Sequence, residues 1–220
     1  YTVSYSKNTA IGQASVKITG KGLYKGTKTV NFNIRPATVT KLKVSSTGEK
    51  SVKLSWKKVT GADSYAVYRY DNTSKKWQRI KTVKAVSFTD SGLARAKGYS
   101  YKIKAVKKSG GKEYISASYS KVVEAVTKPA KASCTAKSAD SGSIEVSWKA
   151  VGGASGYEIY SSSNGSDYVK SAKVGGSQKS AIVSGFEPYS LRMVKVRAYK
   201  TVNGKTSYGT FSQAVMVIVR

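Results

Sequence analysis

Few side chains in this 220-residue chain could perform acid–base or nucleophilic chemistry. The sequence has 11 Asp and Glu residues, a single cysteine at Cys134, and no histidine. A nucleophilic cysteine needs a neighbouring base, and histidine is also the commonest ligand of catalytic zinc. The carboxylates fall at turns and outward strand positions, and no spacing sets two of them across a cleft, as glycoside hydrolysis requires. We therefore expect no catalytic residue, no metal site and no cofactor.

Cations and aromatic rings lie close together at several positions, and this combination could bind a ligand. The outward strand positions with this character are Tyr68, Tyr70, Lys102, Lys104, Tyr160, Lys195, Arg197 and Tyr199. A second cluster contains Trp77 and Arg79 among four lysines. Rings beside cations can stack on sugars while the charge holds an anion. The alternative is cross-strand pairing that stabilises a solvated sheet face by about 0.2–1 kcal/mol per pair, with Trp77 covering a sheet edge.

The net charge of +28 favours polyanionic partners such as teichoic acids, acidic glycans, nucleic acid or anionic membranes. The lysines are scattered through the chain and form no basic block, so the alternative is solubility and a diffuse attraction to an anionic cell wall. No apolar run approaches the length of a membrane span. The first residues do not form a signal peptide, and they begin within an expected strand, so we expect a fragment of a longer polypeptide.

An internal repeat defines the organisation of the chain. Ser51–Tyr68 and Ser143–Tyr160 share nine of 18 positions, and their tryptophans, Trp56 and Trp148, are 92 residues apart. The same offset separates Tyr65 from Tyr157. Two modules of about 90 residues follow, because repeated units of fixed period fold into repeated structures. We predict that the modules span residues 37–127 and 130–220, with prolines 36 and 129 at their boundaries.

Apolar residues alternate with polar ones inside each module. Val52, Leu54 and Trp56 alternate with Lys53 and Ser55, and the second copy repeats the pattern. This period of two is typical of antiparallel sheets with one buried and one wet face. Asn-Gly at 203–204 predicts a type I′ hairpin. The predicted core aromatics are Trp56, Tyr65, Tyr99, Trp148 and Tyr157.

These motifs resemble fibronectin type III domains over residues 37–220. The family carries a tryptophan at the end of its second strand and a Tyr-x-Val pattern in its third, matched here by Trp56 and Trp148 and by Tyr65 and Tyr157. The resemblance implies a seven-stranded Greek-key sandwich and a tyrosine corner at Tyr99. The second module has Arg192 at that position, so either Arg192 makes a different contact or Tyr189 replaces the tyrosine.

Residues 1–35 differ from the modules and predict about three strands. Their pattern is similar to the back half of immunoglobulin-like repeats in surface proteins of Gram-positive bacteria. Three strands are too few for an independent sandwich, so either the remaining strands lie upstream or a neighbouring module or chain supplies them.

The overall prediction is an all-β protein that serves as a non-catalytic spacer or adhesive module. It would belong to an extracellular bacterial protein that is secreted or associated with the cell wall, with upstream domains of the same polypeptide as partners. The alternative function is direct binding of acidic glycans or cell-wall polymers through the cation–aromatic faces. No feature predicts specific binding of nucleic acid.

Overall fold

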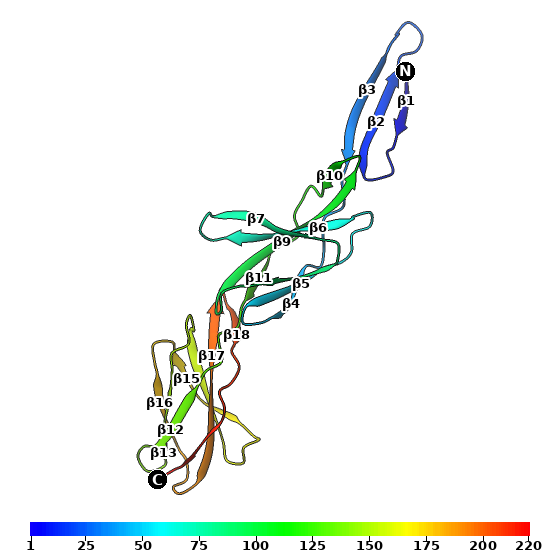
Figure 1. Cartoon of the computed structure of the whole chain (residues 1–220). Helices are drawn as coiled ribbons and strands as arrows, with labels where there is room; N and C mark the ends of the chain where they lie inside the picture. Colours follow the sequence, from blue (N-terminus) through cyan, green and yellow to red (C-terminus); the bar gives the residue numbers. More distant parts are fainter. The chain divides into compact units, whose positions relative to one another are not determined.

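The computed structural model describes all 220 residues, which form 19 β-strands and no helix (Figure 1). The all-β prediction is confirmed. The chain forms two compact units. The first unit comprises Tyr1–Ser45, Lys53–Thr89 and Ser100–Glu124, and the second comprises Ser46–Val52, Asp90–Tyr99 and Ala125–Arg220.

Three antiparallel strands at the N-terminus form a separate sheet, drawn in dark blue in Figure 1. The strands are β1 (Thr2–Ser6), β2 (Gly12–Thr19) and β3 (Thr27–Ile34), in the order β1-β2-β3. Threonines, valines and isoleucines are frequent in them, and these side chains favour extended backbone.

Residues 43–126 form two sheets. The smaller sheet has the order β4-β5-β8, and the larger has the order β10-β9-β6-β7, with β11 also paired to β9. The strands are β4 (Lys43–Thr47), β5 (Ser51–Ser55), β6 (Ser64–Asp71), β7 (Lys76–Val83), β8 (Ser87–Ser91), β9 (Gly98–Ser109), β10 (Lys112–Ile115) and β11 (Val123–Val126).

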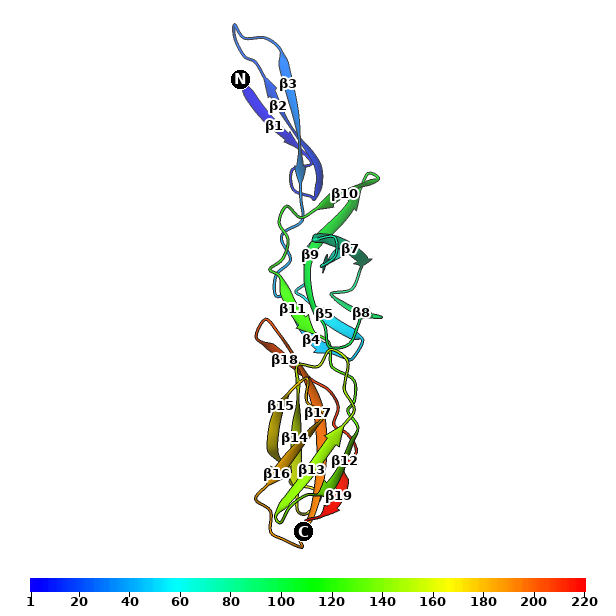
Figure 2. The same cartoon turned by 90° about the vertical axis from the view of Figure 1, so that its left-hand side faces the viewer.

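Residues 134–218 repeat this arrangement strand for strand. The smaller sheet is β12-β13-β16, and the larger is β15-β14-β17-β18 with β19 paired to β17. The strands are β12 (Cys134–Ser138), β13 (Ser143–Trp148), β14 (Gly156–Ser162), β15 (Val169–Gly175), β16 (Ser180–Ser184), β17 (Leu191–Val202), β18 (Lys205–Tyr208) and β19 (Val215–Ile218). Figure 2 shows the two sheets facing each other, with β12 and β13 in front of β14 and β17.

One core of the second copy fills the space between its two sheets. Ile144, Val146 and Trp148 come from the smaller sheet, and they are buried against residues of the larger one such as Ile159 and Val196. Burial of each such side chain contributes about 1.5–3 kcal/mol relative to exposure. The alternation in the sequence therefore becomes one apolar layer enclosed by two sheets.

A tryptophan–tyrosine pair occupies the same place in each copy. The ring centroids of Trp56 and Tyr65 are 5.4 Å apart, and those of Trp148 and Tyr157 are 5.1 Å apart. The tyrosine hydroxyls accept a hydrogen bond from the backbone N–H six residues before them, at 2.8 Å in the first copy and 2.7 Å in the second. All four rings are buried. Each hydroxyl is thus satisfied inside an apolar core, as a buried phenol must be.

The residues at the tyrosine-corner position, Tyr99 and Arg192, differ between the two copies. Tyr99 is half-buried rather than in the core, because its hydroxyl accepts a hydrogen bond from the Ala94 N–H at 2.9 Å. In the second copy the guanidinium of Arg192 stacks over Phe186, with 5.0 Å between Cζ and the ring centroid. Tyr189 is 87% exposed, so it does not replace the missing tyrosine.

The hairpin between β17 and β18 has the predicted turn. Asn203 and Gly204 both have positive φ, at 48° and 75°, and Val202 pairs with Lys205 across them. Two consecutive positive φ angles define a type I′ turn, whose twist matches that of the flanking strands. The hairpin prediction is confirmed.

Candidate functional site

The outward face of the first larger sheet carries an alternating stack of rings and lysines. Lys102 of β9 places its ammonium 4.3 Å from the ring centroid of Trp77 and 3.6 Å from that of Tyr119. The Lys104 ammonium also lies over the Tyr119 ring, 4.3 Å from its centroid. The contacts therefore run from Trp77 to Lys102, Tyr119 and Lys104, and we call these four residues the first ladder. Each cation–ring contact of this kind contributes about 0.5–1 kcal/mol at an exposed site.

The segment that carries Tyr119 is fastened to β9 by backbone and side-chain hydrogen bonds. Ser120 donates its N–H to the Ile103 carbonyl at 2.9 Å, and the Ser120 hydroxyl accepts from the Ile103 N–H at 3.0 Å. Ser116 makes the same pair of bonds to Ala105. These serines are buried, and their paired bonds fix the position of the ring that contacts both lysines.

The second larger sheet carries an equivalent stack. Lys195 lies 3.4 Å from the ring of Tyr168 and 4.6 Å from that of Phe211. The guanidinium of Arg197 lies 4.7 Å from Phe211 and 4.1 Å from Tyr208. We call Tyr168, Lys195, Phe211, Arg197 and Tyr208 the second ladder. Its central ring is held like that of the first, because Ser212 exchanges two hydrogen bonds with Val196.

Glu158 lies beneath the second ladder and is only 1% exposed. Arg197 donates to its carboxylate at 2.7 Å and 3.0 Å, and Lys170 donates at 3.3 Å. Burial alone would raise the pKa of Glu158, but the hydrogen bonds from Arg197 and Lys170 outweigh it and the pKa lies below its usual value. The carboxylate is therefore an ionised structural group that orients Arg197.

The remaining residues of the sequence-predicted site have partners on the same faces. Tyr68 contacts Tyr119 edge-on at 5.1 Å, and Tyr70 contacts Trp77 at 5.4 Å. Arg79 forms an ion pair with Glu113 at 3.0 Å. Burial raises the pKa of the Tyr68 hydroxyl, so this group is a neutral phenol at neutral pH.

Tyr160 and Tyr199 occupy the corresponding face in the second copy. The Tyr160 ring contacts Phe211 at 5.0 Å, and its hydroxyl accepts a hydrogen bond from Arg197 at 3.0 Å. Tyr199 lies 6.3 Å from Tyr208 and receives the ammonium of Lys173 at 4.6 Å. The structure thus gathers the residues expected at 160, 195, 197 and 199 on one face.

The pKa of Lys102 in the first ladder is lowered by its surroundings. Burial lowers this pKa most, and the positive charge of Lys104 lowers it further. The ring contacts offset part of this cost, since the ring faces carry negative potential.

The central rings of both ladders were not identified from the sequence. Tyr119 and Phe211 are 92 residues apart, and each is followed by a serine, so the repeat contained a signal for them. Alternation did not reveal them, because both lie in irregular segments between strands. Glu158 and Tyr168 gave no such signal.

The ladders have a simple chemical consequence. The lysines and arginine point their charges at rings of the same sheet face, and the rings use their faces to hold those charges. A sugar platform needs an open aromatic face, and an anion site needs a cation free to turn toward the ligand. In this arrangement the cations and the ring faces contact each other across the sheet surface.

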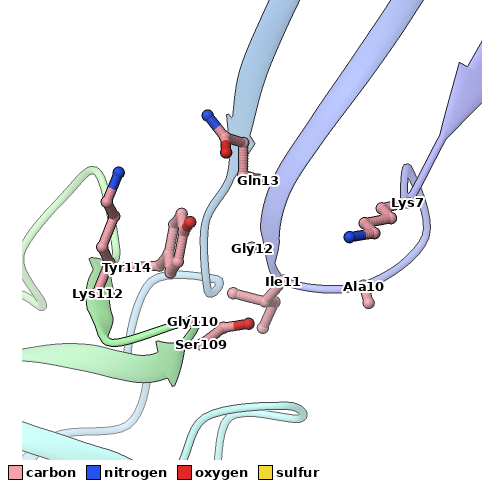
Figure 3. Close-up of a pocket in the computed structure, with 9 residues that line it drawn as sticks. All are labelled: Lys7, Ala10, Ile11, Gly12, Gln13, Ser109, Gly110, Lys112 and Tyr114. Atoms are coloured by element: carbon pink, nitrogen blue, oxygen red, sulfur yellow. The ribbon is translucent and has the colours of Figure 1, made fainter.

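A pocket in the first unit offers no catalytic arrangement (Figure 3). Its lining residues are Lys7, Ala10, Ile11, Gly12, Gln13, Ser109, Gly110, Lys112 and Tyr114. Figure 3 shows Tyr114 and Ile11 on facing sides, with Ser109 and Gly110 below them. The lining includes no carboxylate, so it has no acid–base pair.

Cys134 and the acidic residues also form no catalytic or metal-binding arrangement. The thiol lies 3.1 Å from the Ser212 hydroxyl and 3.8 Å from the Gln213 carbonyl oxygen, and neither group is a base that would deprotonate it. No group of three or more potential ligands is arranged to hold a metal ion. A thiol without a base remains a weak nucleophile. No helix of the structure is long and apolar enough to cross a membrane.

Comparison with solved structures identifies the fold. A segment of two fibronectin type III domains from chicken tenascin superposes with a TM-score of 0.50 and 18% identity, covering 82% of this chain and 98% of that segment. The fold is that of tandem fibronectin type III domains. The FN1–FN3 domains of chicken CNTN1 give a TM-score of 0.41 at 16% identity, over 94% of this chain and 77% of that one. No family model matches the sequence.

The sequence of a curated protein is similar to part of this chain. A poly(3-hydroxybutyrate) depolymerase of Ralstonia pickettii is 42% identical over 100 residues. The matched stretch is 46% of this chain and 18% of the depolymerase. The chain therefore spans less than a fifth of the length of this relative.

Proposed function

We propose that this chain is a non-catalytic spacer or adhesive segment of a larger extracellular bacterial protein. The observation that carries the proposal is the pair of ladders, in which cations and rings that could bind a ligand instead brace the faces of two well-packed sandwiches. Each ladder joins a central strand to an irregular segment near the end of its module. Such bracing suits a module whose task is to hold its shape.

The depolymerase relative suggests one setting for such a segment. Its name describes an enzyme that degrades a polymer, and its similarity to this chain is confined to a minor part of its length. A domain that works on a large polymer benefits from a spacer that keeps it at a set distance from its attachment point. We infer that the present chain performs this role for other domains of its polypeptide. In this view residues 1–35 contribute to an immunoglobulin-like repeat like those of Gram-positive surface proteins.

Turnover assays test the absence of catalysis directly. The purified chain should hydrolyse neither a soluble p-nitrophenyl ester nor a film of poly(3-hydroxybutyrate), because no nucleophile–base pair is present. Turnover that persists through purification and is lost on Cys134→Ser would contradict the proposal.

Small-angle scattering tests the spacer role. Each module, measured by itself, should have the dimensions of a compact sandwich, and these dimensions should not change between low and moderate salt. A module that swells as the salt concentration changes would contradict a shape-holding role.

A second function is favoured by the net charge of +28, with 39 basic and 11 acidic residues. In this alternative the chain binds an acidic glycan or cell-wall polymer. Retention on a heparin or teichoic-acid matrix above about 0.3 M salt would support it, because diffuse attraction between exposed charges is largely screened there. The triple variant Tyr68→Ala, Lys102→Ala, Lys104→Ala should then elute earlier than the wild type. An unchanged elution profile would exclude a site on this face.

A further inference from the structure

The N-terminal sheet has one apolar face and one polar face. Pairing in the β1-β2-β3 sheet places Tyr5, Val16 and Val30 side by side, and Ala14 beside Phe32. Val3 and Ile18 extend the same face, and Lys28 lies beside Ile18 at its end. The opposite face carries only polar side chains, namely Thr2, Ser4, Ser6, Gln13, Ser15, Lys17, Thr19, Thr27, Thr29, Asn31 and Asn33. This division is typical of one layer of a sandwich, whose apolar face is covered by a second sheet.

Most of the apolar face is uncovered in this chain, although Ala14 is buried. Tyr5 is 61% exposed, Val30 46%, Val3 43%, Ile18 38% and Phe32 37%. Equivalent alternating residues in the two modules, such as Val146 and Ile159, are fully buried. Soluble proteins seldom leave a contiguous apolar patch of this kind without a partner.

The size of the face indicates what covers it. The three strands have five, eight and eight residues. At about 3.4 Å per residue and about 4.8 Å between strands, they present on the order of 350 Å². Two copies packed face to face would bury roughly 700 Å² in total, which is below the roughly 1,000 Å² of a specific interface. The net charge of +28 on each copy also opposes self-association.

The small contact area and the repulsion between like-charged copies do not prevent a segment of the same polypeptide from covering this face. A tethered segment is present at an effective concentration on the order of millimolar, so a small interface suffices. The depolymerase relative is itself much longer than the part that resembles this chain. We propose that the apolar face of β1-β2-β3 is covered by a strand layer from another segment of the same polypeptide, with apolar residues at every second position. The inference depends on the proposed function only in placing the chain within a longer protein.

Cysteine labelling in two proteins tests the inference. Val30→Cys places a thiol on the apolar face, and Asn31→Cys places one on the polar face of the same strand, each in a Cys134→Ser background. Both thiols should react rapidly with iodoacetamide in the 220-residue chain. In the longer natural polypeptide the Val30→Cys thiol should react at least about tenfold more slowly, because it becomes accessible only on local opening. The Asn31→Cys rate should not change.

Two results would overturn the inference. Equal Val30→Cys rates in the two proteins would show that no segment covers the face. Slow labelling in the 220-residue chain, together with a concentration-dependent dimer in sedimentation, would show that a second copy covers it. Neither result bears on the spacer role, because turnover and scattering of the modules test that role separately.

Discussion

The guanidinium of Arg197 and the carboxylate of Glu158 lie directly opposite each other on β17 and β14 and form a buried ion pair, with Nη2 2.7 Å from Oε2. The corresponding opposed residues of the first module are Lys104 and Ala66. The two modules share their strand order and their ladders, yet only the second contains this pair. The second module therefore has a cross-strand ion pair at a position where the first module has none.

Glu158→Ala is expected to destabilise the second module by about 2–4 kcal/mol, because it leaves Arg197 without its anionic partner on a largely desolvated face. Glu145→Ala is the matched control, since Glu145 pairs with Lys137, whose side chain is 75% exposed. Exposed pairs of this kind contribute about 0–1 kcal/mol. Urea unfolding of the isolated variants measures both. Equal losses would show that the Glu158 pair contributes no more than a surface contact.

The stability of the second module should fall at acidic pH. The pKa of Glu158 is lower in the folded state than in the unfolded state, so the ionised group stabilises the fold above the unfolded pKa of about 4.3. This contribution disappears as the pH falls through the lower folded pKa. Melting temperatures recorded between about pH 6 and pH 2 should therefore drop more steeply for the wild type than for Glu158→Gln. Parallel profiles would contradict this assignment.

Tyr119→Ala should destabilise the first module by about 1–3 kcal/mol, because it removes the ring shared by Lys102 and Lys104 and its edge contact with Tyr68. Tyr189→Ala, which removes an 87% exposed ring, should change stability by less than about 0.5 kcal/mol. Thermal unfolding of both variants gives the comparison. If Tyr119→Ala changed the stability as little as Tyr189→Ala, the first ladder would not contribute to the stability of the module.

The two core tryptophans should respond differently to phenylalanine. The indole N–H of Trp148 donates to the Gln178 carbonyl at 3.1 Å, whereas that of Trp56 is buried without a partner. Trp148→Phe loses a hydrogen bond, and Trp56→Phe removes an unsatisfied donor. We expect Trp148→Phe to lower the free energy of unfolding of the second module by about 1 kcal/mol more than Trp56→Phe lowers that of the first module. Chemical unfolding followed by near-ultraviolet circular dichroism checks the order, and the reverse order would contradict the prediction.

Gly156 of β14 should tolerate no side chain. A Cβ built there would lie 2.3 Å from the Val174 carbonyl oxygen and 2.5 Å from the Tyr199 hydroxyl, so β15 or Tyr199 would have to move. Gly156→Ala is expected to destabilise the second module by about 1–3 kcal/mol. Gly175, directly opposite on β15, has nothing within 4 Å of its Cβ position. Gly175→Ala should therefore leave the urea midpoint nearly unchanged, and an equal loss of stability in both variants would contradict the steric explanation.

The sequence by itself determined the repeat, the alternating strands of the modules and most of the residues that face the core, Tyr99 being the exception. Alternation with a period of two assigns every second side chain to one face, and an offset of 92 residues carries the assignment from one module to the other. The turn at Asn203 followed from local backbone preferences, which need no distant partner.

Only the tertiary structure decided what the outward side chains do. Period two states which face a lysine occupies, but it does not state which ring from an irregular segment will lie over that lysine. Tyr119 reaches Lys102 because Ser120 bonds to Ile103, and Glu158 is buried because Arg197 and Lys170 close over it. Such contacts join residues far apart in the sequence, and their energies depend on how each neighbour excludes water. The partners of the predicted binding residues were therefore decided only when the chain folded.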